Sequence, residues 1–291
     1  IPDSVISLAD QVFSNCTNLS SVSIGSSVSS MGENIFSGCS NLVEINAHVN
    51  NTVYSSINGV LFSADHGTLI MFPAGISGEY AVPASVYFIS DGAFSNCSSI
   101  TSITIPDSVS SIGSLAFTGC TGLTSIIVSS GNTVYLAIDG VLFSKDQTVI
   151  ICCPSGKTGT YTIPGSVSVV GDNAFNGCSG LTSISIPETF ATIGDNAFRS
   201  CTGLTSITIP STVNTIGNGA FYGCTGLSSI SIPESVTTLG EGIFKSCTAL
   251  TSVNIPSTLT TIGNEAFSGC TVLTDVSIPA SVSSIGDRAF Y

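Results

Sequence analysis

Hydrophobic residues return along this chain at a fixed interval. One phenylalanine position recurs every 23 residues, with two intervals of 58, and its ten members are Phe13, Phe36, Phe94, Phe117, Phe175, Phe198, Phe221, Phe244, Phe267 and Phe290. A leucine or isoleucine follows six residues later in nine repeats, and an apolar residue precedes by eight in all ten. A period of about 20 to 50 residues predicts a solenoid, because one coil cannot bury its apolar face and its neighbours must cover it.

Each repeat begins with a strand-like segment. In the letters LTSITI, Leu204, Ile207 and Ile209 follow the L-x-x-I-x-I spacing of a leucine-rich repeat strand. Thr208 lies between two inward residues and therefore faces outward. Pro210 ends the strand, since it has no N–H for a ladder.

The second half of the repeat predicts a return segment and a turn. Val213 and Ile216 indicate a second short extended segment, and Gly217 makes the corner, as glycine does in eight of ten repeats. The next letters, NGAFYGC, are too few for a stable free helix. We expect a single helical or 3₁₀ turn that places Phe221 inside.

Two repeats are enlarged, at about 46–83 and 127–164. Residues 51–83 match residues 132–164 without a gap, so a larger unit occurs twice. In each, GVLFS and the next apolar run flank a turn with Asp65 or Asp146, which predicts a hairpin added to the coil. Insertions in a solenoid often emerge on the binding face, which makes Tyr54, His66 and Tyr135 candidate binding residues. The alternative is that these aromatic residues only pack the hairpin.

Nine cysteines lie three residues after the repeat phenylalanine. They are Cys16, Cys39, Cys97, Cys120, Cys178, Cys201, Cys224, Cys247 and Cys270. No C-x-x-C spacing occurs and only two histidines are present, which argues against zinc. Equivalent cysteines would lie ~4.8 Å apart with parallel side chains, a poor geometry for disulfides. We predict buried thiols that act as small apolar fillers. Cys152 and Cys153 match Met71 and Phe72 of the first enlarged repeat, so they belong to the core.

Two polar positions recur with the same period. A serine or threonine precedes the position eight before phenylalanine in all ten repeats, and we expect its hydroxyl to bond the turn backbone. An acid lies three residues before phenylalanine in seven repeats. This pattern predicts capping of the helical turn. The alternative, a Ca²⁺ ladder, is interrupted by Ser114, Asn218 and Asn264.

The line IGxxAFxxCxxLTSIxIPxSV and the longer variant with GVLFS resemble the BspA-like leucine-rich repeats of bacterial and protist surface proteins. The resemblance covers essentially the whole chain. It implies a leucine-rich repeat solenoid, a curved right-handed superhelix of 23-residue repeats with short β-strands and helical or 3₁₀ turns. It also implies a secreted or surface-attached adhesion protein that binds host or matrix protein or glycan. The repeat has no catalytic residues and no cofactor to carry over.

We expect residues 1–291 to form a single solenoid domain. The sequence opens inside a repeat and shows no polar capping module at either end, although a solenoid needs polar caps for solubility. A fragment of a longer chain is therefore the expected status of this sequence.

Composition excludes several classes of function. Charged residues make up 8%, and the net charge of −13 argues against nucleic acid and anionic lipid as partners. No apolar run approaches the ~18 residues of a membrane span. The acids are scattered over the repeat and no histidine meets a serine or cysteine in a nucleophilic arrangement, so we expect no enzyme and no metal or cofactor.

Outward positions of the first strands predict a flat strip of small hydroxyls, and these form the candidate binding face. They include Glu44, Asn46, Ser102, Thr104, Ser125, Ser183, Ser185, Ser206 and Thr208. Asn15, Asn18, Asn50 and Asn96 begin N-glycosylation sequons. We expect an extracellular or cell-surface location, although eleven cysteines without a disulfide plan argue the other way.

Three functions remain open at this stage. The first is an extracellular binding or adhesion module. The second is a structural spacer or filament that stacks end to end through self-association. The third is an ice-ordering surface, which a strip dominated by serine rather than threonine disfavours.

Overall fold

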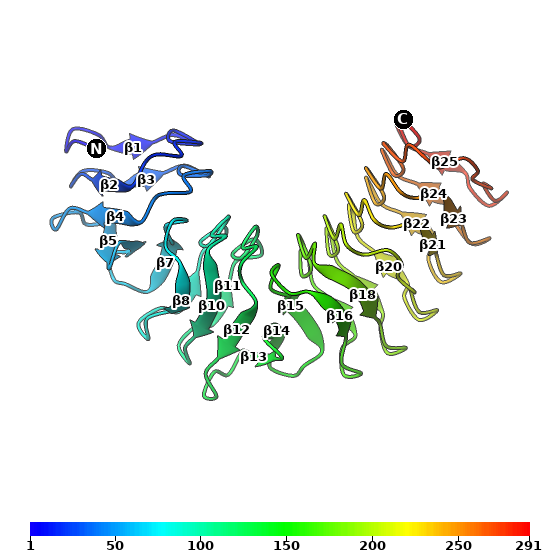
Figure 1. Cartoon of the computed structure of the whole chain (residues 1–291), viewed down its shortest axis with the longest axis horizontal. Coiled ribbons are helices and arrows are strands. Elements are labelled where there is room, and N and C mark those ends of the chain that lie inside the picture. The colour runs from blue at the N-terminus through cyan, green and yellow to red at the C-terminus, as the bar shows by residue number, and fades with distance from the viewer. The chain divides into compact units, whose positions relative to one another are not determined.

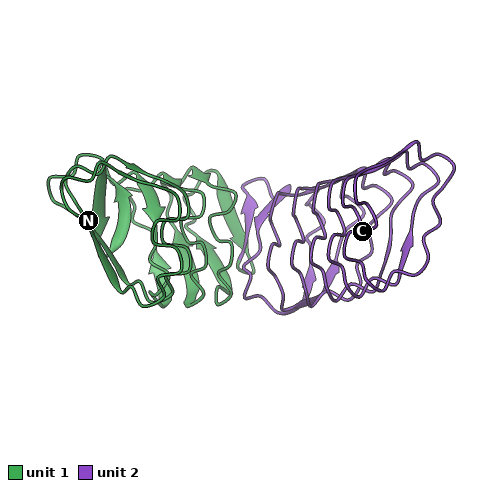
Figure 2. Cartoon of the chain, turned by 90° about the horizontal axis from the view of Figure 1, so that it is seen from above, with its two compact units in different colours: residues 1–140 green, residues 141–291 purple.

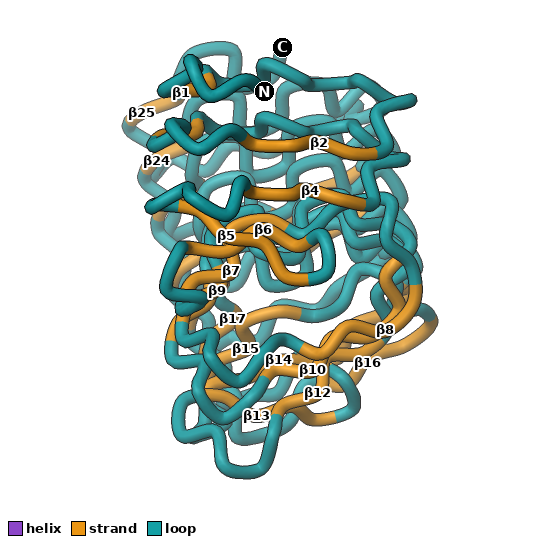
Figure 3. Tube along the Cα trace, turned by 90° about the vertical axis from the view of Figure 1, so that its left-hand side faces the viewer, coloured by secondary structure: helices purple, strands orange, loops and turns teal.

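The computed structural model describes residues 1–291, and every regular element in it is a β-strand (Figure 3). The chain divides into two compact units, Ile1–Gly140 and Val141–Tyr291 (Figure 2). The boundary falls within the second enlarged repeat. Each unit is a stack of coils made from the same repeat, so the predicted solenoid is confirmed.

The strands are short and follow the repeat (Figure 1). Unit 1 contains β1 (Ser7–Leu8), β2 (Ser21–Ile24), β3 (Ser30–Met31), β4 (Glu44–Ala47), β5 (Tyr54–Ile57), β6 (Val60–Ser63), β7 (Thr68–Met71), β8 (Gly78–Ala81), β9 (Phe88–Ile89), β10 (Ile100–Ile105), β11 (Ser111–Ile112), β12 (Ser125–Val128) and β13 (Tyr135–Ile138). Unit 2 contains β14 (Val141–Ser144), β15 (Val149–Cys152), β16 (Gly159–Thr162), β17 (Val169–Val170), β18 (Leu181–Ser185), β19 (Thr192–Ile193), β20 (Thr215–Ile216), β21 (Ser229–Ser231), β22 (Thr238–Leu239), β23 (Ser252–Asn254), β24 (Thr261–Ile262) and β25 (Ser284–Ile285).

Neighbouring coils pair in parallel and in register. The first strands of successive repeats, here called A-strands, form pairs such as β2–β4, β10–β12 and β21–β23. The return segments, here called B-strands, form a second set that includes β17–β19–β20 and β22–β24–β25. Partners such as Ile103 and Ile126 are one repeat apart and both buried. One repeat of sequence is therefore one coil, as the period predicts.

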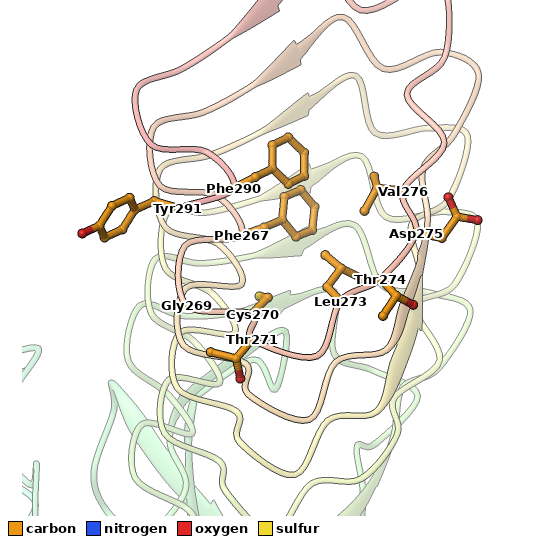
Figure 4. A pocket seen from close by; sticks show the side chains of 10 residues that line it. All are labelled: Phe267, Gly269, Cys270, Thr271, Leu273, Thr274, Asp275, Val276, Phe290 and Tyr291. Carbon is orange, nitrogen blue, oxygen red and sulfur yellow. The ribbon is translucent and has the colours of Figure 1, made fainter.

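The repeat phenylalanines stack into a column inside the coils. In unit 2 the five consecutive ring pairs from Phe175 to Phe290 have centroids 5.1 to 5.5 Å apart and interplanar angles of 6 to 23°. Figure 4 shows Phe267 and Phe290 one above the other, facing Val276 across the interior. These centroid distances lie within the range of about 4.5–7 Å in which aromatic rings attract each other.

The predicted helical turn around the phenylalanine is wrong. Its N–H groups alternate between two acceptors: Phe198 N–H donates to Ala220 O of the next coil, whereas Arg199 N–H donates to Asn196 O within its own coil. In most coils the residues two before and two after phenylalanine, such as Asn196 and Ser200, have positive φ. A helix directs all its N–H groups along its own axis, so a turn that shares them with the next coil cannot be one.

The acid position acts between coils instead of capping a helix. Oδ1 of Asp195 accepts a hydrogen bond of 2.7 Å from the N–H of Asn218, the same position one coil later. Asn218 repeats the contact with Glu241 at 2.8 Å. An amide oxygen and a carboxylate oxygen serve equally here, which explains why Asn264 also occupies this position.

The corner glycines are needed for close approach of the coils. A Cβ on Gly217 would lie 2.4 Å from Asp195 Oδ1 and 2.5 Å from the Asp195 nitrogen. Ser90, an exception to the glycine rule, follows an enlarged repeat, and its N–H donates to Leu69 O of β7 as the N–H of Gly217 does to Ile193 O. The corner therefore keeps its hydrogen bond to the preceding coil with either residue.

The enlarged repeats extend the B-strand sheet. The predicted hairpin is confirmed: β6 and β7 are antiparallel, β7 then pairs in parallel with β9, and β5 adds to β6. Leu61, Phe62 and Leu69 are fully buried. In unit 2, β14 and β15 form the same hairpin and β15 pairs with β17. The inserts are thus part of the core, which supports the packing alternative for their aromatic residues.

Removing one ring from the phenylalanine column tests its contribution to stability. Phe221→Ala is expected to lower the free energy of unfolding by about 3–5 kcal/mol, because it leaves a cavity between two stacked rings. Phe290→Ala is the matched control, since that ring is 45% exposed, and it is expected to cost less than half as much. Urea unfolding measures both, and equal losses would contradict the column's role.

Adding one methyl group at the corner tests the close approach. Gly217→Ala is expected to destabilise the protein by about 1–3 kcal/mol through overpacking. Gly165→Ala, where no atom lies within 4 Å of the added Cβ, is expected to change stability by less than about 0.5 kcal/mol. Thermal unfolding distinguishes the two, and a neutral Gly217→Ala would show that the coils need no glycine.

Candidate functional site

The most open polar surface of unit 2 is the outward face of its A-strands. We call it the hydroxyl strip, defined by Thr160, Thr162, Ser183, Ser185, Ser206, Thr208, Ser229, Ser231, Ser252, Asn254, Asp275 and Ser277. All twelve side chains are exposed. Parallel pairing such as Ser206 with Ser229 and Ser229 with Ser252 aligns them in rows. Adjacent rows are ~4.8 Å apart, the spacing of paired strands.

The strip is hollowed over its later coils. A shallow groove of about 720 Å³ runs from Ser206 and Thr208 to Asp275 and Ser277. Its floor is formed by the isoleucines and valine between the outward residues, such as Ile230. A volume of this size falls within the ~300–1,000 Å³ of ligand clefts.

Some hydroxyls of the groove are engaged and others are free: the Ser231 hydroxyl accepts from the side-chain amide of Asn254 at 3.2 Å. Neighbouring hydroxyls are used by the stack: Thr251 Oγ1 donates to Ser228 O, and Ser228 Oγ donates to Thr205 O. By contrast, the side chains of Ser229 and Ser252 make no hydrogen bond within the protein. Each of these groups offers one donor and two acceptor sites to a ligand.

The remaining predicted site residues are more covered. Tyr54 and Tyr135 are only 9% and 8% exposed, because they pack beneath the inserts, and burial raises the pKa of both phenols. These two rings lie inside the fold and form no part of an exposed face. His66 is half-buried in the turn between β6 and β7, with its ring 6.5 Å from that of Phe62.

In unit 1 the predicted strip is less accessible. Glu44 is exposed, but four other members are half-buried, namely Asn46, Ser102, Thr104 and Ser125. The tip of the first insert lies beside β4, where Ile45 N–H donates to Gly59 O. The insert therefore takes up part of the space that is open in unit 2.

Sequence reasoning missed Thr160 and Thr162. They lie on β16, which pairs with β18 so that Thr160 meets Ser183 and Thr162 meets Ser185. The letters YTIP at 161–164 match ISIP in the regular repeats, and this match was the available signal.

Most of the cysteines are buried as predicted. None of the eleven forms a disulfide, and eight of them are buried. The prediction is wrong at Cys16, which is exposed, and Cys152 and Cys270 are half-buried. The thiols of the regular coils donate to a phenylalanine carbonyl of the preceding coil, as Cys201 does to Phe175 O at 3.2 Å and Cys224 to Phe198 O at 3.1 Å. Desolvation raises the pKa of the Cys120 thiol to about 12. Such thiols pack and cap carbonyls, and they are poor nucleophiles.

The serine and threonine hydroxyls that precede the B-strands also form hydrogen bonds between coils. Ser108 Oγ donates to Val86 O at 2.7 Å, and Ser281 Oγ donates to Leu259 O at 2.7 Å. The expected bond to backbone is thus confirmed at these positions, and its acceptor is the preceding coil.

Several basic residues are occupied within the protein. The Arg199 guanidinium lies 4.4 Å from the ring centroid of Tyr222, and Lys245 lies 5.9 Å from the same ring. Lys245 also forms an ion pair with Glu265, which raises the pKa of the lysine and lowers that of the carboxyl. These charges therefore serve local contacts on the turn side of the coil.

The four sequon asparagines are exposed. Asn15, Asn18, Asn50 and Asn96 all lie at the surface. Asn15 and Asn96 have positive φ and donate their backbone N–H to the next coil. No three or more His, Cys, Asp or Glu side chains gather into a metal-binding group. The structure also has no helix with the length and apolarity needed to cross a bilayer.

The fold and the repeat define a family. The family model for the BspA type leucine rich repeat region matches residues 1–80, 77–156 and 168–291. The chain therefore belongs to the BspA-type leucine-rich repeat family. Comparison with curated proteins gave no match.

Solved structures of similar fold include bacterial leucine-rich repeat proteins. A leucine-rich repeat protein from Eubacterium ventriosum is 28% identical, with a TM-score of 0.71 over 93% of this chain and 82% of that one. A leucine rich cell surface protein from Faecalibacterium prausnitzii is 28% identical, with a TM-score of 0.63 over 97% of this chain and 83% of that one. The pneumococcal vaccine antigen PcpA, 19% identical with a TM-score of 0.52 over 98% and 73%, shares the fold.

Alkylation rates test the burial of the thiols. At pH 8, Cys120 is expected to react with iodoacetamide at least a hundredfold more slowly than the exposed Cys16, since burial raises the pKa of the Cys120 thiol to about 12 and shields its sulfur from the reagent. Pulse labelling with peptide mass mapping gives both rates, and urea-unfolded protein is the control, where the rates should converge. Equal rates in native protein would contradict the buried column.

Proposed function

We propose that this chain is a non-catalytic binding module of a bacterial cell surface, and that the hydroxyl strip of unit 2 is its binding face. The observation that carries the proposal is the groove between Ser206 and Ser277, which presents the unengaged hydroxyls of Ser229 and Ser252. The family, together with the chain's similarity to a cell surface protein of Faecalibacterium prausnitzii, supports this location.

The chemistry of the strip favours a ligand rich in hydroxyl or amide groups. Serine and threonine hydroxyls donate and accept, and the strip offers them in rows at a constant spacing. It lacks the tyrosine, tryptophan and arginine anchors of tight protein interfaces. A glycan or the glycosylated surface of a host or matrix protein fits this pattern. Weak single contacts are compensated when many copies act together on one cell.

A second candidate is a spacer or filament whose chains stack end to end. The coil at 269–291 exposes Phe290 and, beside it, a hollow of about 270 Å³ lined in part by Phe267, Leu273 and Val276 (Figure 4). Within the chain such a ring is covered by the next coil, as Phe244 is by Phe267, and a coil of a second copy is the partner that fits the same contact. Light scattering that rises with protein concentration and falls with Phe290→Asp supports stacking; a monomer at all concentrations contradicts it.

Bulky charged substitutions in the groove test the binding face. Ser229→Arg with Ser252→Arg is expected to reduce binding to a glycan array and to immobilised matrix glycoproteins at least tenfold, because two long side chains fill the groove. The control is Thr238→Arg together with Thr215→Arg, exposed threonines on the B-strands, which should leave binding unchanged. Equal losses in both variants, or no binding by the native protein in either assay, would contradict the proposal.

A further inference from the structure

The first enlarged repeat interrupts the column of phenylalanine turns in unit 1. In a regular coil this turn has about ten residues, as in GDNAFRSCTG at 194–203. In the enlarged repeat the matching segment is the short stretch 71–75. Phe72 keeps the aromatic position, with its ring 5.0 Å from that of Phe94, and Cys97 Sγ donates to Phe72 O. The rest of the turn is missing.

The shortened turn leaves backbone donors without partners on one side. In regular coils, N–H groups at the phenylalanine and two residues on either side of it donate to the next coil, as Asn173, Phe175 and Gly177 do. The equivalent groups of Asn34, Phe36 and Gly38 have no acceptor in the protein. Asn34 and Gly38 have the same positive φ as their counterparts, so the three N–H groups keep the orientation of the regular ladder.

The opposite side of the gap carries unused acceptors. In regular coils three carbonyls of the following turn accept from the turn before it, at the positions of Asp91, Ala93 and Ser95. Only Ala93 O receives a backbone N–H here, from Phe72 at 2.7 Å. The Asp91 carbonyl receives none, and the Ser95 carbonyl receives only the Cys97 thiol, at 3.9 Å. A row of donors therefore faces a row of acceptors across the missing turn.

A cleft of about 400 Å³ occupies this gap. Its floor is apolar and includes Met71, Phe72, Pro73 and Ala74, with Leu115 at one side. Glu33 and Asp91 lie at its rim, and both side chains are exposed. The cleft thus combines apolar surface, two open backbone edges and negative charge.

We propose that this cleft binds a polypeptide segment of a partner protein that carries a large apolar side chain next to a lysine or arginine. A peptide backbone is the ligand that supplies carbonyls to one wall and N–H groups to the other, as in binding modes that complete an open backbone edge. The apolar side chain covers the floor, and the basic residue pairs with Glu33 and Asp91. The cleft is formed by unit 1 and the hydroxyl strip by unit 2, so each is tested separately.

Hydrogen exchange of the native protein tests the open edge. The amides of Asn34, Phe36 and Gly38 are expected to exchange at least tenfold faster than those of Asn173, Phe175 and Gly177, which are the same residue types at the same positions in a closed ladder. Nuclear magnetic resonance measures all six. Equal protection in the two sets would show that the edge is closed and would overturn the proposal.

Peptide binding tests the occupant. The probe is a synthetic peptide with the sequence of residues 194–203, with serine in place of Cys201, because it reproduces the missing turn and carries Phe198 beside Arg199. It is expected to bind and to slow exchange at Asn34, Phe36 and Gly38 at least fivefold. A peptide with serine in place of Phe198 as well should bind at least tenfold more weakly. No binding at 5 mM, equal binding of the two peptides, or binding without protection of the three amides would overturn the proposal.

Protein variants separate the floor from the rim. Ala74→Phe fills the cleft and is expected to weaken binding at least tenfold. Glu33→Gln with Asp91→Asn should weaken it three- to tenfold at low salt, and asparagine is tolerated at the second position, as Asn218 shows. Asp172→Asn with Asp195→Asn, the same charge change in unit 2, should leave binding unchanged. Equal binding by the filled variant, or self-association of the free protein that Ala74→Phe abolishes, would overturn the proposal.

Discussion

The contact between one coil and the next is the interaction on which the rest of the structure depends. Backbone N–H groups of the phenylalanine turn, the side chains at the acid position, the cysteine thiols and the hydroxyls before the B-strand all find their acceptors or donors one coil away. The phenylalanine rings do the same through stacking. A single coil satisfies neither its apolar face nor its polar groups, so stability accumulates along the stack.

This use of polar groups explains the low charge of the chain. Small hydroxyls and amides reach the adjacent coil at a spacing of ~4.8 Å without the long stems of lysine or glutamate. Where a hydroxyl is not needed by the stack, it remains available, and this occurs on the outward A-strand positions such as Ser229 and Ser252. The same repeat therefore provides both the internal bonds and the surface proposed to bind.

Much of the coil could be predicted from the sequence, because the period fixes which residues lie above one another. The inward Ile207 and Ile209, the phenylalanine column, the burial of most cysteines and the hairpin after Val60 were predicted correctly. The helical turn was predicted wrongly because the residues typical of helix caps were assumed to bond within their own coil. The signal against it was the frequent asparagine and glycine at the positions two before and two after phenylalanine, such as Asn196 and Gly177, which adopt positive φ.

The candidate sites were harder to predict, because they depend on where the regular contacts stop. Tyr54 is buried because β5 and β6 extend the B-strand sheet as antiparallel strands. This strand pairing is visible in the structure and not in the sequence. The open N–H groups of Asn34 and Phe36 follow from the shortened turn at Phe72, 36 residues after Phe36, and no local pattern marks them.

The measurement that tests the dependence on neighbouring coils most directly is the folding of an isolated pair of coils, residues 194–239. If coils stabilise one another, this fragment is unfolded: its circular dichroism lacks a cooperative transition, and Cys201 and Cys224 react with iodoacetamide at the rate of a free peptide. A monomeric fragment that unfolds cooperatively and protects both thiols would contradict the account.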